Sequence, residues 1–69
     1  MNQEKFNQIC INELNSRISL KRQRGINWGE QDDKKFMNWF VKNTNEVFGL
    51  DLHASRAKFL MFMIQHSPL

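Results

Sequence analysis

Basic side chains and a tryptophan lie close together in the chain between residues 17 and 28. Lysine and arginine bind phosphates or carboxylates, and an exposed indole can stack on a nucleic-acid base. A structural interpretation is also available, because cations in the last turn of a helix oppose its dipole and a tryptophan can pack over a loop. We predict a surface here that binds a partner or a phosphate, with a dipole-matched helix end as the alternative. The residues concerned are Arg17, Lys21, Arg22, Arg24 and Trp28.

No set of residues favours catalysis or metal binding. Cys10 and His53 could in principle act as a nucleophile and its base, but Cys10 falls on an apolar stripe, where a cysteine is normally an inert packing residue. Asp32 and Asp33 are adjacent, so on a helix their side chains diverge by about 100°. Two histidines and one cysteine, far apart in sequence, are too few for a structural zinc site. We therefore expect a protein that is not an enzyme, with no catalytic residue, no metal and no cofactor.

The length and the charge of the chain further limit the classes of protein to which it can belong. Its 69 residues make one small domain, 1–69, and a chain of this size buries only ~60% of the surface that it exposes when unfolded. The net charge is +3, and basic residues outnumber acidic ones by five to two in residues 1–28, whereas acidic residues outnumber basic ones by five to three in residues 29–51. The start of the chain has no apolar signal segment, and no apolar run approaches the ~20 residues that span a bilayer. A cytoplasmic protein that does not enter a membrane is expected.

Apolar residues at spacings of three and four predict the first helix, at about 3–22. They are Phe6, Ile9, Cys10, Leu14 and Ile18. Gly25 is expected to end this helix in the left-handed conformation. Glu13 and Arg17 are four residues apart in the order that favours an ion pair, which we place over the edge of the core. A polar seam that selects a partner helix is the alternative interpretation of that pair.

A second helix is predicted at about 28–48. Asn27 followed by Glu30 matches a capping box, and the acidic residues of the first turns suit the positive end of the helix dipole. Gly49 is a typical helix stop. The broad apolar face is formed by Phe36, Met37, Trp39, Phe40, Val41, Val47 and Phe48.

The third helix is predicted at about 52–65, capped by Asp51 or Ser55. Residues 59–64 are apolar on every side, and a helix of this kind must be buried all round. Two other helices cannot cover it fully, so we predict a homodimer that associates through this helix. The predicted self-association residues are Phe59, Leu60, Phe62 and Met63. Two alternatives stay open: a buried strand at 58–64, and a hairpin that pairs 17–20 with 26–28.

The sequence therefore predicts an all-α, compact three-helix domain. Its predicted function is that of a small non-enzymatic regulatory, adaptor or inhibitor protein that binds another protein. A small DNA- or RNA-binding regulator, which contacts phosphates through the basic end of the first helix, is the alternative. The third helix is an unsuitable recognition helix, because it offers chiefly apolar side chains where base edges require donors and acceptors.

Overall fold

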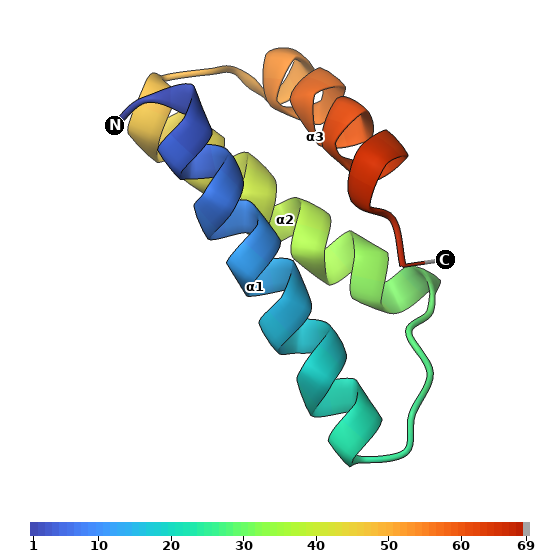
Figure 1. Ribbon diagram of the computed structural model, residues 1–69. Helices are drawn as coiled ribbons and strands as arrows, with labels where there is room; N and C mark the ends of the chain where they lie inside the picture. Colours follow the sequence, from blue (N-terminus) through green and yellow to red (C-terminus); the bar gives the residue numbers. More distant parts are fainter. Residues whose placement is uncertain (69) are drawn as a thin grey trace.

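A computed structural model of the chain describes residues 1–68 and contains three helices (Figure 1). They are α1 (Gln3–Gln23), α2 (Glu30–Phe48) and α3 (Leu52–His66). α2 runs back in the opposite direction to α1, and α3 returns along α2, so that the end of α3 lies near the start of α2 (Figure 1). The predicted all-α three-helix class is confirmed, and residues 58–64 and 17–20 are helical, which excludes the strand and the hairpin within the part of the chain that is described.

Glycines end the first two helices, as predicted. Gly25 has a φ of 71° and Gly49 a φ of 68°, both in the left-handed region. At the end of α1 the Gly25 N–H donates to Arg22 O and the Ile26 N–H donates to Lys21 O, both at 3.0 Å. These two bonds form a Schellman motif, which satisfies carbonyls that the helix itself leaves unpaired.

The start of α2 differs from the prediction. The N-cap is Gly29 and not Asn27, and the Gly29 N–H donates to Asp32 Oδ2 at 2.9 Å. The capping carboxylate is therefore Asp32, two residues later than the predicted Glu30, and Trp28 lies in the loop before the helix. α3 is capped by Asp51, whose Oδ1 accepts from the Ala54 N–H at 2.9 Å.

The core is built largely from phenylalanine rings. Phe36 of α2 is fully buried, and its ring lies 5.8 Å from the rings of both Phe59 and Phe62 on α3. Phe6 of α1 meets Phe40 edge-on at 5.8 Å between ring centroids, which joins α1 to the same cluster. The buried apolar residues are Phe6, Cys10, Leu14, Phe36, Phe40, Phe59 and Phe62.

One expectation about burial is wrong, and the residues predicted on α3 divide between the core and the surface. On α2 the predicted core residue Val47 is 38% exposed, whereas Thr44, which the apolar pattern omits, is fully buried. On α3 only Ser55, Phe59 and Phe62 are buried, so the other two helices cover this helix on one side and leave the rest of it exposed, as the prediction of incomplete cover requires. Two of the predicted self-association residues, Phe59 and Phe62, thus belong to the core of the single chain. The large apolar residues that α3 exposes over its second half are Leu60, Met61 and Ile64.

Polar contacts complete the fold at its edges. The predicted Glu13–Arg17 ion pair is present, with 3.0 Å between Arg17 Nε and Glu13 Oε2, and both side chains are partly exposed. Lys58 Nζ of α3 donates to Gln3 Oε1 of α1 at 2.9 Å. Over residues 1–68, none of the helices has both the length and the apolar character that a membrane span requires.

Candidate binding site at the α1–α2 corner

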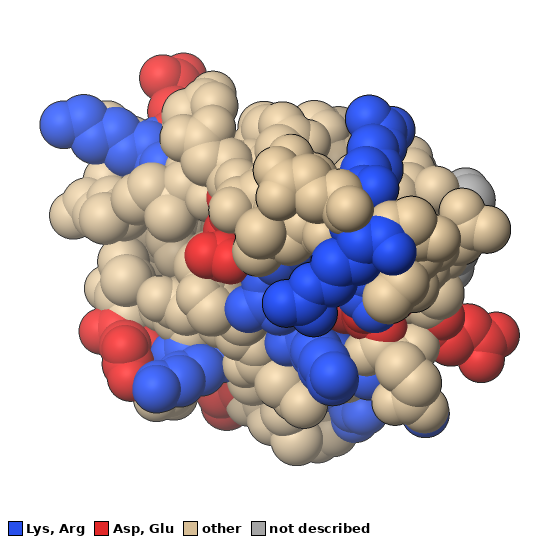
Figure 2. Space-filling model, turned by 90° about the horizontal axis from the view of Figure 1, so that it is seen from below, with Lys and Arg blue, Asp and Glu red and all other residues tan. Residues whose placement is uncertain are grey.

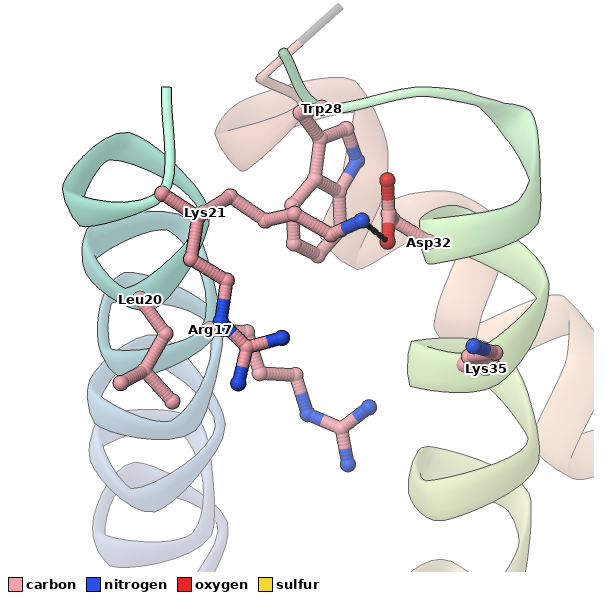
Figure 3. A pocket seen from close by; sticks show the side chains of 7 residues that line it. Arg17, Leu20, Lys21, Trp28, Asp32 and Lys35 are labelled. Atoms are coloured by element: carbon pink, nitrogen blue, oxygen red, sulfur yellow. Dashed lines mark ion pairs between the residues drawn. The ribbon is translucent and has the colours of Figure 1, made fainter. Parts of the chain in front are cut away.

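A hollow of about 190 Å³ lies between the last turns of α1 and the first turns of α2 (Figure 3). It contains four of the five residues that the sequence singles out, and we call it the basic hollow. Its walls are formed by Arg17, Leu20, Lys21, Arg24, Trp28, Asp32 and Lys35. The fold therefore brings most of the predicted binding residues to one place.

The fifth predicted residue, Arg22, faces a different space. It lines an adjoining hollow of about 470 Å³ that α1 and the α1–α2 loop share with the end of the chain. Lys21 and Trp28 line both spaces, so they form the ridge between them. The remaining walls of the adjoining hollow are Ile18, Ile26, Asn27, His66 and Pro68. One hollow is mainly cationic, and the other combines aliphatic walls with Arg22 and His66.

Two of the cations in the basic hollow are already engaged by acidic side chains. Lys21 Nζ of α1 lies 2.9 Å from Asp32 Oδ1 of α2, as the dashed line in Figure 3 marks. The bond from Lys21, together with the Gly29 N–H, lowers the pKa of Asp32 below its ordinary value. Arg17 is paired with Glu13, and its guanidinium also lies 5.8 Å from the centre of the Phe36 ring. These contacts fix the two side chains, and they also close the end of α1 onto the start of α2.

Trp28 forms an aromatic wall and is not a free stacking platform. Its indole Nε1–H donates to Asp33 Oδ1 at 2.7 Å, and its ring packs against the hydrophobic core. This is the structural interpretation that the sequence left open for Trp28. The ring is only partly buried, so one part of it still faces the two hollows.

The remaining cations give the corner its excess of positive charge. Within residues 1–68, Arg22, Arg24 and Lys35 take part in no ion pair. Of the four cationic side chains in the basic hollow, Lys21 is paired with Asp32 and Arg17 with Glu13, so Arg24 and Lys35 supply two uncompensated positive charges. Figure 2 looks onto this end of the molecule and shows Lys and Arg side chains gathered over the middle of the face, with acidic side chains between and around them.

Lys35 is a member of the site that the sequence prediction missed. It lies in the acidic middle of the chain and does not belong to the basic run of residues 17–24. The available signal is its spacing of three from Asp32, which places the two side chains on the same face of α2. The positive charge of Lys35 is one of the causes that lower the pKa of Asp32.

The structure offers no catalytic or metal-binding arrangement at the residues that the sequence considered. Cys10 is fully buried, and this burial raises the pKa of its thiol to about 12, so the nucleophilic thiolate does not form near neutral pH. His53 lies on the exposed side of α3. Within residues 1–68, no three histidine, cysteine, aspartate or glutamate side chains lie close enough together to hold a metal ion.

The chain matches no protein-family model, no curated protein and no solved structure. The geometry of the corner suits the binding of an anionic group that also presents apolar surface, because cations and apolar walls lie side by side.

Replacing Asp32 by asparagine should lower the melting temperature at pH 7, because the charge that pairs with Lys21 is removed. The pKa of Asp32 is depressed in the folded chain, so its contribution is complete above its ordinary value of 3.8 and is lost as the pH falls through the folded value. The difference in melting temperature between the parent and Asp32→Asn should therefore be constant above about pH 5 and shrink below it. Thermal denaturation followed by circular dichroism at several pH values measures it.

The matched control is Glu46→Gln, which removes an exposed carboxylate of α2 that takes part in no ion pair. It should change the melting temperature little at any pH. An Asp32→Asn difference that keeps its full size at pH 2.5 would contradict the assignment of the stabilising charge to Asp32.

Proposed function

We propose that this chain is a small non-enzymatic regulatory or adaptor protein that acts by binding another protein at the α1–α2 corner. The observation that carries the proposal is the basic hollow, in which Arg24 and Lys35 are free of acidic partners beside Leu20 and Trp28. An inhibitor would also act by binding another protein, and it would require only that binding at the corner blocks that protein. The cytoplasm is the expected compartment, because a single buried cysteine needs no oxidising environment.

The shape of the corner supports an extended acidic segment of a protein as the ligand. The two hollows meet at Lys21 and Trp28, so a chain that crosses this ridge reaches both of them. Carboxylates of such a segment would bind Arg24 and Lys35, which keep their hydrogen-bond donors available. An adjacent aliphatic side chain would pack against Ile18 and Ile26. Aromatic residues and arginine are also enriched at protein interfaces relative to the rest of the surface.

A DNA- or RNA-binding regulator is the second candidate, supported by the same excess of cations. Two features count against it. The indole edge of Trp28 is held by Asp33, so the ring is not free to stack on an exposed base. Three or four phosphate contacts would also give only weak and strongly salt-dependent affinity.

The two candidates are separated by fluorescence polarisation with two probes of equal net charge. One is a short labelled peptide of glutamate and leucine residues, and the other is a labelled single-stranded DNA. We expect the peptide to bind more tightly, and the double substitution Arg24→Glu, Lys35→Glu to weaken it by at least ~10-fold, as expected when charge pairs are reversed. Asp32→Asn should strengthen the binding of the peptide, because it removes the acidic side chain from the hollow.

The control for the double substitution is Lys5→Glu, Lys42→Glu, which changes the net charge equally at exposed positions outside both hollows. It should change the affinity for the peptide less than ~3-fold, because only long-range electrostatics is altered. Tighter binding of the DNA, with an affinity that falls steeply with salt, would replace the proposal by the second candidate. If neither probe binds at low salt, the corner is a structural element and the proposal fails.

A further inference from the structure

The side of α3 that faces away from the core is apolar and lacks a partner within the chain. Leu60 is 64% exposed, Met61 69% and Ile64 83%, although each is a large hydrophobic side chain. At about 100° per residue these three lie opposite the buried residues Phe59 and Phe62. Ala57, also exposed, continues the same face one turn earlier. A contiguous patch of this kind is typical of an interaction site.

This face is complementary to a second copy of itself in the antiparallel orientation. Its first half carries the small Ala57, and its second half carries the bulky Ile64. When two copies cross between residues 60 and 61, Ala57 of each lies opposite Ile64 of the other. Leu60 and Met61 of both copies then meet around the two-fold axis. A parallel pair would place small residues against small ones and large against large, which fills the space less well.

Charge favours the same orientation. α3 has no acidic residue, and its arginine and its lysine, Arg56 and Lys58, both lie in its first half. A parallel pair would bring these cations of the two copies to the same level. An antiparallel pair separates the two Arg56 positions by nine residues along the helix, which is roughly 13 Å at 1.5 Å per residue. It also aligns the two helix dipoles in opposite directions.

We propose that two copies of this chain form a symmetric, antiparallel homodimer through Ala57, Leu60, Met61 and Ile64 of α3. A contact between two single helices is at the small end of protein interfaces, so a dissociation constant in the micromolar range, roughly 10⁻⁶ to 10⁻⁴ M, is expected.

The dimer also determines where the two α1–α2 corners lie relative to each other. Because His66 and Pro68 line the adjoining hollow, the corner lies at the C-terminal end of α3, and antiparallel pairing puts the two corners at opposite ends of the dimer. The dimer would therefore present two well-separated binding sites.

Sedimentation velocity over a dilution series up to about 1 mM tests the association. The parent chain should show a concentration-dependent shift from monomer to dimer. Ile64→Asp should raise the dissociation constant by at least ~30-fold, because it buries two charges in an apolar contact. The fold of the monomer should be unaffected, since Ile64 is 83% exposed. The matched control is Leu52→Glu, an apolar-to-acidic change at the first residue of α3, outside the proposed face, and its dimer should form as in the parent.

The orientation is tested by oxidative cross-linking. Cys10 is buried and does not interfere, so single cysteines can be introduced elsewhere. An equal mixture of Ala57→Cys and Ile64→Cys chains should form a disulfide between the two variants, whereas Ala57→Cys alone should form little. In an antiparallel pair the two positions 57 are separated by seven residues along the helix, roughly 10 Å, beyond the reach of a disulfide.

A strictly monomeric chain at 1 mM would overturn the proposal. A dimer that Ile64→Asp leaves intact would overturn it as well, because the interface would then lie elsewhere. Efficient cross-linking of Ala57→Cys alone would overturn the antiparallel arrangement. None of these outcomes depends on whether the α1–α2 corner binds a partner.

Discussion

Replacing Phe36 by alanine should remove a large part of the stability of the chain. The ring is fully buried at the centre of the core, and it packs against Trp39, Phe40, Phe59 and Phe62 at centroid distances between 5.7 and 6.4 Å. Removing a buried phenylalanine costs about 3–5 kcal/mol, because the transfer free energy is lost and a cavity remains. A native domain of this length has a total stability of only about 3–10 kcal/mol. The urea midpoint of Phe36→Ala, followed by far-ultraviolet circular dichroism, should therefore lie far below that of the parent.

The control for this substitution is Leu52→Ala, which also shortens a large apolar side chain but at a position 53% exposed and outside the outer face of α3. Its free energy of unfolding should remain within about 0.5 kcal/mol of the parent value, as is usual for surface changes. A Phe36→Ala chain that loses less than about 1 kcal/mol would contradict the central position of this ring in the core.

The fold was predictable where its determinants are local. The spacing of Phe6, Cys10 and Leu14 identified the buried face of α1, and Gly25 and Gly49 identified the ends of two helices. These signals depend on residues within one or two turns of each other, so a sequence is sufficient to read them. The start of α2 was misplaced because Asn27 and Gly29 are both acceptable N-caps, and only the backbone shows that Asp32 bonds to the Gly29 N–H.

The sequence left undecided which side of α3 is buried, because this depends on how the helices meet in space. Residues 59–64 are apolar on every side, so the sequence cannot say which side faces the core. The aromatic cluster on α2 decides it, since Phe36 and Phe40 contact Phe59 and Phe62. Leu60 and Ile64 are left outside, where they form the face that we assign to a second copy.

The part of the candidate site that lies at the end of α1 was predictable from the sequence, whereas the part on α2 was not. Arg17 and Lys21 lie on α1 and Arg24 is its C-cap, and spacings of four and three put them on one side of the helix end. Lys35 and Asp32 belong to the next helix, and they join the site only because the α1–α2 loop brings the two helix ends together. The Lys21–Asp32 ion pair therefore has two roles at the corner: it holds the helix ends together, and it lowers the local excess of positive charge.

Replacing Thr44 by valine should destabilise the chain although the shape of the side chain is retained. Thr44 and Ser55 are fully buried, and their hydroxyl oxygens lie 2.7 Å apart between α2 and α3. Thr44 Oγ1 also lies 3.0 Å from the carbonyl oxygens of Phe40 and Val41. A hydroxyl has one hydrogen to donate, so both groups are satisfied when Thr44 donates to these carbonyls and accepts from Ser55.

The loss expected for Thr44→Val is about 1–3 kcal/mol in the free energy of unfolding, because the Ser55 hydroxyl is left buried without an acceptor. Urea denaturation of the parent, Thr44→Val, Ser55→Ala and the double variant gives a complete cycle. The double variant should recover part of the loss, since an apolar pair has no polar group to desolvate, and the two single losses should not add. Strict additivity would show that the two hydroxyls act independently.

The same pair adds a directional contact to the orientation that the aromatic cluster gives α3. Phenylalanine contacts alone tolerate rotation or sliding of one helix on another, because apolar contacts have little directional preference. The Thr44–Ser55 bond is directional, and it is the only buried contact between two side-chain polar groups within residues 1–68. If it fixes the rotation of α3, the parent and Ser55→Ala should differ in hydrogen exchange along α3 more than along α1. A fixed rotation is also what keeps Leu60, Met61 and Ile64 together on the outer face, so Ser55→Ala should weaken self-association although Ser55 lies on the opposite side of the helix.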